Sequence, residues 1–311
     1  MKMLVLLNKY SNNGRGLKKW EVLRPELEKK YAKGNYSVYS NFGGFSERLS
    51  TEIRKGERVL VSAGGDGTVH FLLNQIMKIK RNKRKTLVMG AIGLGSSNDF
   101  HKPHSGSMYK NGRVPLKLDF ENARAHNVGQ VDFEDEQGRR QRRYFIINSS
   151  LGIIAQANYL FNSKERIIKW LKSRWVMGTI WYAALKTLFR ARNVKARIKV
   201  GEDSLLTEIT SLSVLITPYV SGNFRYDFNV SSQSDFLGVA LCERMGVLAR
   251  LKTIFSLSRS KFTGLPKTRT WEASQVEIYP DSPTPLELDG EVFLASKIKI
   301  RLLQGILKVS Q

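Results

Sequence analysis

Three glycines surround one aspartate in the segment GGDGT, at positions 64–68, between two apolar runs. Glycine adopts positive φ values easily and lets backbone N–H groups approach a ligand without a Cβ in the way. A helix that begins here adds partial positive charge and unpaired N–H groups at its first turn. The segment therefore predicts a turn that binds phosphate groups through four residues: Gly64, Gly65, Gly67 and Thr68.

Asp66 is an unusual residue type for an anion-binding turn. Its carboxylate would fit if it meets a metal ion, contacts a ribose or orients a neighbouring segment. The alternative is a tight strand-to-helix turn in which Asp66 is only a cap. The lysine and serine or threonine of the Walker pattern are absent from this turn, so it is not a P-loop.

Two other loops of small polar residues follow strand-like runs. NKYSNNGRG (8–16) follows the first apolar run, and GSSNDF (95–100) follows the run at 86–93. In a parallel sheet such loops all leave the carboxyl edge, which is where ligands bind. The three loops together therefore indicate one ligand site.

The elements that would position these loops alternate along the first third of the chain. Strands are expected at 2–8, 36–40, 58–63 and 86–93, and helices at 16–33, 46–56 and 68–80. This alternation predicts an α/β domain with a parallel, Rossmann-like sheet.

After about residue 125, closely spaced strands predict a β-rich second domain, sandwich-like or a distorted barrel. We expect an α/β domain over residues 1–125 and a β-rich domain over residues 126–301, with a cleft between the two. Residues 302–311 are candidates for a last strand that completes the α/β domain.

The chain carries 51 Lys and Arg against 27 Asp and Glu among 311 residues, for a net charge of +24. A net positive charge of this size attracts anionic partners such as nucleotides, anionic bilayers or nucleic acid. A nucleic-acid reading rests on charge alone, because no binding motif accompanies it. Cys242 is the single cysteine, so an intramolecular disulfide and a cysteine zinc site are excluded, and its apolar surroundings predict a buried thiol.

The first residues, MKMLVLLNKY, are interpreted as a strand and not as a signal peptide. The longest uncharged apolar stretch, 175–185, is about half the length of a bilayer crossing. We therefore expect a cytoplasmic protein that is soluble or peripheral to the membrane. The oligomeric state stays open, with a homodimer as one alternative.

These motifs together resemble the diacylglycerol kinase catalytic family, which includes bacterial lipid kinases and sphingosine kinases and is related to NAD kinase. The matching segments follow the family's order: NKYSNNGRG, GGDGT, GSSNDF, YFIINSSLG (144–152) and LELDGEVF (286–293). The resemblance implies an ATP-dependent kinase of a lipid hydroxyl, such as that of diacylglycerol, at the inner face of the membrane.

The resemblance also implies a role for individual residues. ATP would be held by Asn8, Ser11, Ser40, Gly64, Gly65, Asp66, Gly67, Thr68 and Ser96. Asp66 would meet the catalytic Mg²⁺, and Asp289 and Glu291 would supply the general base on the lipid hydroxyl. A structural Mg²⁺ would be held by Ser232, Asp235 and the carbonyl of Leu237.

Several positions depart from the family pattern. Phe71 stands where many members have glutamate, and Phe236 replaces a glycine beside Asp235. LDGE also has a plainer interpretation, because Asp-Gly is a strong signal for a hairpin turn with solvated acids. The departures support a non-catalytic lipid- or nucleotide-binding protein as one alternative, and a kinase of a soluble acceptor, as in NAD kinase, is another.

A basic segment provides a candidate membrane contact. Residues 161–199 hold eleven Lys or Arg against one acid, Glu165, with tryptophans interleaved among them. Tryptophan and cations suit an interface with anionic lipid. The alternative is that the aromatic residues pack on the β-rich domain and that the charges are solvated.

Overall fold

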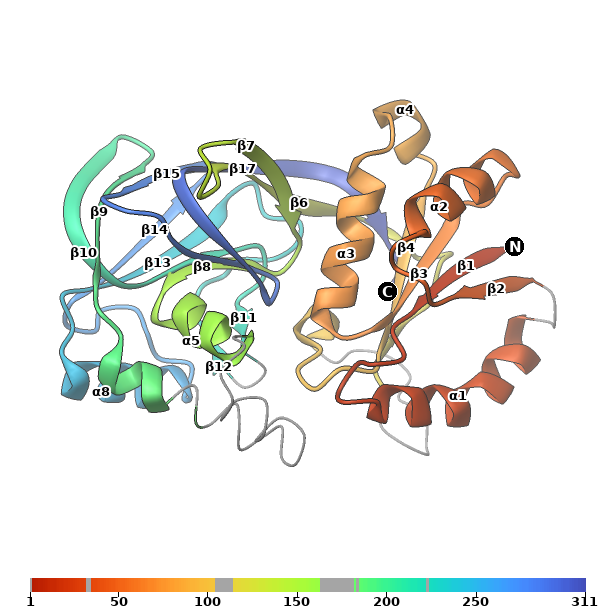
Figure 1. Cartoon of the computed structure of the whole chain (residues 1–311), viewed down its shortest axis with the longest axis horizontal. Helices are drawn as coiled ribbons and strands as arrows, with labels where there is room; N and C mark the ends of the chain where they lie inside the picture. The colour runs from red at the N-terminus through yellow and green to blue at the C-terminus, as the bar shows by residue number, and fades with distance from the viewer. Residues whose placement is uncertain (1, 32–34, 104–113, 163–181, 183–184, 222–223) are drawn as a thin grey trace. The chain divides into compact units, whose positions relative to one another are not determined.

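The computed structural model describes residues 2–31, 35–103, 114–162, 182, 185–221 and 224–311. Figure 1 shows the chain as two compact units. Unit 1 comprises residues 1–127 and 305–311, and unit 2 comprises residues 128–304. The boundaries predicted from the sequence, at residues 125 and 302, lie within three residues of these.

Unit 1 alternates strands and helices, as its periodicity predicts. In chain order its elements are β1 (Met3–Leu7), α1 (Arg15–Tyr31), β2 (Tyr36–Tyr39), α2 (Phe45–Arg54), β3 (Val59–Gly64), α3 (Asp66–Met77), α4 (Arg81–Arg84), β4 (Val88–Gly93), the 3-10 helix η1 (Asp99–His101) and β5 (Leu116–Lys117).

The sheet of unit 1 has the order β2-β1-β3-β4, and all four strands are parallel. The last residues of β17 (Glu291–Val309) pair in parallel with β4, and the short strand β5 pairs antiparallel with the same strand. Both faces of β1 and β3 are buried, because α1 covers one face and α2 and α3 cover the other (Figure 1). Strands that are buried on both faces have apolar residues at nearly every position, so their sequences form the unbroken apolar runs from which these strands were predicted.

Unit 2 is rich in strands. Its elements are β6 (Arg124–Glu134, shared with unit 1), β7 (Arg140–Phe145), β8 (Asn148–Gly152), α5 (Ile153–Asn162), β9 (Val194–Val200), β10 (Asp203–Leu215), β11 (Tyr219–Val220), β12 (Phe224–Arg225), β13 (Leu237–Glu243), α8 (Val247–Leu257), β14 (Thr268–Ala273), β15 (Gln275–Pro280), β16 (Thr284–Leu288) and β17.

Six strands of unit 2 close into a ring, so of the two expected arrangements the structure has the barrel-like sheet and the sandwich is corrected. The ring runs β8-β16-β17-β15-β9-β10 and back to β8. Closure depends on two long strands that change partners along their length. β10 shifts register between Ile209 and Ser211, and β17 has a positive φ at Lys297. Such irregularities let a sheet curl on itself.

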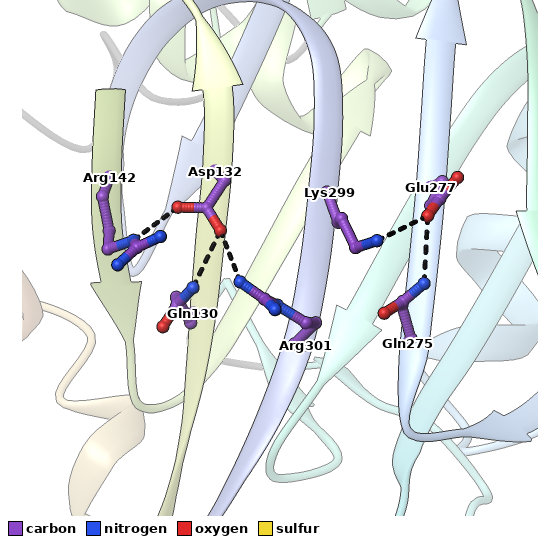
Figure 2. Close-up of polar contacts among 7 residues, drawn as sticks. All are labelled: Gln130, Asp132, Arg142, Gln275, Glu277, Lys299 and Arg301. Atoms are coloured by element: carbon purple, nitrogen blue, oxygen red, sulfur yellow. Dashed lines mark hydrogen bonds and ion pairs between the residues drawn. The ribbon is translucent and has the colours of Figure 1, made fainter. Parts of the chain in front are cut away.

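The inside of this ring holds one apolar core of unit 2. A second apolar cluster packs against β10 and β13, whereas the outer face of β15 and β17 is polar. The core holds apolar residues from every strand of the ring. Figure 2 shows two networks on outward-facing side chains, one centred on Asp132 and one on Glu277. Asp132 accepts hydrogen bonds from Gln130, Arg142 and Arg301, and Glu277 accepts from Gln275 and Lys299. Much of the positive charge of this face is therefore paired.

Candidate active site

The four strands β1 to β4 end at one edge of the unit 1 sheet. Because they are parallel, the loops that follow them begin side by side, at Asn8, Ser40, Gly65 and Leu94. This is the carboxyl edge, where open α/β sheets bind ligands. Every residue predicted to hold the nucleotide therefore lies at or next to this edge of unit 1.

The GGDGT segment forms the turn from β3 into α3. Gly65 is the N-cap residue, with φ −94° and ψ −170°, and no side chain caps the helix. The first N–H groups of α3 have no partners within the helix and carry its partial positive charge. A Cβ on Gly64 would lie 2.1 Å from Oγ1 of Thr68, so only glycine lets Thr68 fold back against the strand.

Two glycines allow this turn to touch the loop after β4 through their backbones. A Cβ on Gly95 would lie 2.4 Å from Cα of Gly65, and a Cβ on Gly65 would lie 3.2 Å from Cα of Gly95. Any side chain at position 95 would push the two loops apart. The glycines therefore create an edge at which two stretches of main chain lie together.

Asp66 joins the same two loops by hydrogen bonds. Its Oδ2 accepts from the backbone N–H of Asp99 and its Oδ1 from the backbone N–H of Phe100, each at 3.1 Å. Three roles were considered for this carboxylate, and these bonds correspond to one of them: Asp66 orients a neighbouring segment, the β4–η1 loop. Its contact with Mg²⁺ stays a prediction.

Asn98 fixes the inside of the β4–η1 loop, and sequence reasoning assigned it no role. It adopts the left-handed conformation, with φ 55°, and is buried. Its side chain accepts from the N–H of Gly95 and donates to the carbonyl oxygens of Gly93 and Gly95. Asparagine tolerates this conformation better than most residues, so its place in GSSNDF was the available signal.

The β1–α1 loop reaches α3 through Asn8. Its Nδ2 donates to Oγ1 of Thr68 at 3.2 Å, and its Oδ1 accepts from the N–H of Tyr10. Thr68 is buried, but a hydroxyl that accepts one bond can still donate its own proton. Ser11 packs against Gly16, and within the part of the chain that the structure describes its buried Oγ has no hydrogen-bond partner.

The remaining predicted nucleotide residues differ in exposure. Ser40 and Ser96 are exposed, so their hydroxyls can reach a ligand. Phe71, which replaces the glutamate of many family members, packs against Phe42 and Phe45 with ring centroids 4.8 Å and 6.0 Å away. An aromatic cluster with the β2–α2 segment thus accounts for this departure.

In unit 2, the LDGE segment is a two-residue hairpin turn between β16 and β17, flanked by the pair Leu288 and Glu291. Asp289 and Gly290 have φ values of 49° and 94°. Positive φ at both central residues is the geometry that favours Asp-Gly in hairpins. The plainer interpretation of this segment is therefore right about the turn, but only one of the two acids is exposed.

The two acids of the hairpin have different surroundings. Asp289 is 2% exposed, and its carboxylate accepts from the backbone N–H groups of Ile146, Ile147 and Asn148. Glu291 is exposed. Asp289 therefore fixes the hairpin to the β7–β8 turn, and Glu291 is the acid of the pair that a ligand can reach.

Glu287 is a buried acid that the sequence analysis did not single out. It accepts from Oγ of Ser150 at 2.5 Å and from the N–H of Gly290. Ser150 lies in the YFIINSSLG strand, whose resemblance to the family was noted without a residue role. These bonds hold the hairpin against β8 from its other side.

The predicted structural metal site lies in the loop before β13. Asp235 is exposed, and within the described residues its carboxylate has no hydrogen bond or ion pair. Ser232 is half-buried, Leu237 is the first residue of β13, and Phe236 packs against the neighbouring core. One carboxylate with hydroxyl and carbonyl oxygens suits Mg²⁺, which keeps several waters. The described residues hold no group of three or more His, Cys, Asp or Glu placed to bind a metal.

Much of the basic segment 161–199 lies outside the described residues, namely 163–181 and 183–184 with all three of its tryptophans. Among the described residues, no helix combines the length and the apolar character needed to cross a membrane.

Residues 2–131 match the family model for the diacylglycerol kinase catalytic domain. The resemblance drawn from the motifs is thereby confirmed. The chain is 24% identical over 279 residues to a diacylglycerol kinase of Staphylococcus aureus, covering 87% of this chain and 82% of that protein.

The fold is also that of a solved protein. The crystal structure of a diacylglycerol kinase from Bacillus anthracis superposes with a TM-score of 0.66 and 15% identity, over 99% of this chain and 96% of that one. At this identity the comparison shows the fold alone.

Proposed function

We propose that this protein is an ATP-dependent lipid kinase, which transfers the γ-phosphoryl group of ATP to a hydroxyl of a lipid such as diacylglycerol. One observation carries the proposal: the uncapped start of α3 meets the Gly65–Gly95 contact at the carboxyl edge of the unit 1 sheet. The edge lies in the segment that matches the family model of the diacylglycerol kinase catalytic domain.

In this proposal the main-chain N–H groups of Gly65 to Gly67 bind the phosphates, and the dipole of α3 favours their negative charge. The exposed hydroxyls of Ser40 and Ser96 add donors. Asp66 keeps the β4–η1 loop against the turn by accepting its two N–H bonds. Mg²⁺, when bound, would neutralise charge on the triphosphate, and Asp66 and Asp235 are the carboxylates proposed to hold the ions.

Glu291 is the proposed general base, because it is the exposed acid of the hairpin. The lipid oxygen forms a bond to the γ-phosphorus as the bond to the β,γ-bridging oxygen breaks. ADP leaves with that oxygen, and the hydroxyl proton passes to the carboxylate of Glu291. Asp289 positions the hairpin through its three N–H bonds and does not itself act on the substrate.

The experiment is incubation of the protein with γ-labelled ATP, Mg²⁺ and separate acceptors: diacylglycerol, a sphingoid base, a polyprenol and NAD. Label in an organic-soluble product is the expected result and would also identify the lipid. ATP binding without transfer would favour a non-catalytic protein, and label on NAD would favour a soluble acceptor. We propose a cytoplasmic location at the inner face of the membrane, where such a lipid would be met.

Asp66→Asn tests the role given to this carboxylate. The amide keeps one oxygen acceptor for the N–H groups of Asp99 and Phe100 but loses the charge. We expect little transfer activity and a loss of stability of about 1 kcal/mol, measured by labelled-product yield and urea unfolding. Turnover equal to the parent chain would refute any role for Asp66 in phosphoryl transfer.

A further inference from the structure

Helix α8 of unit 2 has an inverted distribution of side chains. Its buried residues are Arg250 and Leu257. Leu248 and Phe255 are 77% and 57% exposed, and Leu251 and Ile254 are exposed as well. Positions 248, 251 and 255 follow helical spacing, so their side chains form one stripe. An ordinary surface helix presents the opposite arrangement, with its apolar stripe inward.

Arg250 fixes this orientation of α8. Its guanidinium donates to the carbonyl oxygens of Met245 and Leu188 and to Oδ1 of Asn193, at 2.9–3.2 Å. A buried guanidinium is stable only where such acceptors surround it. Turning the helix to bury Leu248 would remove all three acceptors, so the outward apolar stripe is a built feature of unit 2.

The surroundings of the stripe are cationic. No aspartate or glutamate occurs between residues 244 and 261, whereas Lys252 and Arg259 are exposed beside the stripe. The guanidinium of Arg259 lies over the ring of Phe255, 3.9 Å from its centroid. This pairing lets an aromatic ring enter an apolar layer while its cation stays at the polar boundary.

We propose that α8 is a membrane-docking helix that lies in the headgroup layer of an anionic bilayer, with Leu248, Leu251, Ile254 and Phe255 inserted. The inference rests on the proposed function for its purpose, because a lipid kinase must reach an acceptor that stays in the bilayer. An apolar stripe with adjacent cations is the pattern that binds such interfaces.

Two observations favour an anionic bilayer over other contacts of α8. First, the cations elsewhere on unit 2 are less available to anionic lipid, because on the outer face of β6, β15 and β17 Arg142 and Arg301 pair with Asp132 and Lys299 pairs with Glu277 (Figure 2). Second, within the described residues no carboxylate pairs with Lys252 or Arg259. A second copy docked by the same stripe would bring these cations together, which opposes self-association.

The test measures co-sedimentation of the whole protein, without nucleotide, with phosphatidylcholine vesicles that contain or lack phosphatidylglycerol. Leu248→Ser/Phe255→Ser removes the apolar stripe without changing charge. The matched control is Leu206→Ser/Val22→Ser, because those side chains are 71% and 52% exposed and lie elsewhere, on β10 and α1.

We expect the parent chain to bind the anionic vesicles, the α8 variant to bind at least about tenfold more weakly, and the control to bind like the parent. Equal binding by both variants would overturn the proposal. A fall in melting temperature of the α8 variant alone would mean that the stripe packs on this chain, and a change in its oligomeric state would mean that it packs on a second copy. Either result would also overturn the proposal.

An environment-sensitive dye on Leu251→Cys reports the depth of insertion directly. Cys242 does not compete for the label, because burial raises the pKa of its thiol to about 12. We expect a blue shift of emission on anionic vesicles, and an unchanged spectrum would contradict insertion. Kinase activity on a short-chain, water-soluble diacylglycerol should be the same in the α8 variant and the parent, so failure of docking and failure of the kinase proposal are distinguishable.

Discussion

Asp289 and Glu291 are separated by one glycine, yet they have different surroundings. The left-handed conformation at Asp289 turns its carboxylate inward to the N–H groups of Ile146, Ile147 and Asn148, and Glu291 remains exposed. The two acids of this motif therefore have different roles: Asp289 positions the hairpin, and Glu291 is the candidate general base.

This division predicts opposite behaviour of two variants. Glu291→Gln should lower kcat by about 10²–10⁴-fold and leave the melting temperature unchanged, because the side chain is exposed. Asp289→Asn should lower the free energy of unfolding by about 2–3 kcal/mol, since an amide nitrogen would face backbone N–H groups. Labelled-product rates and thermal melts of both proteins measure this, and a stability loss confined to Glu291→Gln would contradict the assignment.

The buried side chain of His126 should make the stability of unit 1 depend on pH. Burial, with a smaller effect from the nearby charge of Lys117, lowers the pKa of His126 to about 4. An unfolded histidine has a pKa near 6.5, so between these values the unfolded chain binds a proton that the folded chain does not. Stability should therefore be complete above about pH 6.5 and fall by on the order of 3 kcal/mol as the pH approaches 4.

Urea unfolding across this pH range checks the prediction, with His126→Gln as the comparison. Glutamine cannot take up the proton but can keep a donor for the carbonyl oxygen of Asn127, which His126 Nδ1 contacts at 2.6 Å. The variant should show a flatter dependence between pH 4 and 6.5. An unchanged slope would assign the effect to other groups.

At the scale of elements, the contact between the β3–α3 turn and the β4–η1 loop depends on Gly95. Gly95→Ala would place a Cβ 2.4 Å from the main chain of Gly65, which cannot move aside cheaply. We expect a loss of about 1–3 kcal/mol in stability, together with weaker nucleotide binding. Urea unfolding and calorimetry with Mg²⁺ and ATP measure the two effects.

Gly43→Ala is the control for this prediction. Its Cβ would meet only Oδ1 of Asn41, at the ordinary contact distance of 3.5 Å. Stability should stay within about 0.5 kcal/mol of the parent chain, and ATP affinity should not change. If the two alanine variants behave alike, close approach of the loops is not what the glycines provide.

The elements of unit 1 could be predicted because their signals are local. The apolar runs at β1, β3 and β4 and the helical spacing of Trp20, Leu23 and Leu27 lie within single segments. A barrel was one of two arrangements expected for unit 2, but the pairing that closes the ring could not be predicted, because it depends on β10 and β17 changing partners midway.

The partners of single side chains were equally inaccessible to sequence reasoning. Asp66 bonds to N–H groups about thirty residues away, and Asp289 bonds to groups more than 140 residues away. The motifs marked both acids as important. No periodicity or spacing in the sequence indicates that main-chain N–H groups would occupy their oxygens.

At the scale of the whole molecule, unit 1 is built from both ends of the described chain. Leu307 and Val309 are buried, and Val309 pairs with Met89 of β4. The segment 305–311 therefore completes a sheet whose four parallel strands β1 to β4 are formed before residue 94 and whose short strand β5 ends at Lys117.

Val309→Ala should lower the stability of unit 1 by about 2 kcal/mol, because it leaves a cavity beside β4. Lys308→Ala, one residue earlier and exposed, should change it by less than about 0.5 kcal/mol. Hydrogen exchange of amides in β3 and β4 should accelerate only in the valine variant. Faster exchange confined to unit 2 would show that the last strand supports the other unit.

The late position of that strand has a consequence for protein synthesis. Residues 2–127 emerge from the ribosome first, but their sheet lacks its β17 edge until residues 305–311 follow, after the whole of unit 2. The nascent unit 1 must wait with the Val88–Met89 part of the β4 edge uncovered while some 180 residues are translated. Slow translation or premature termination near residue 300 would therefore leave an aggregation-prone chain that chaperones must hold.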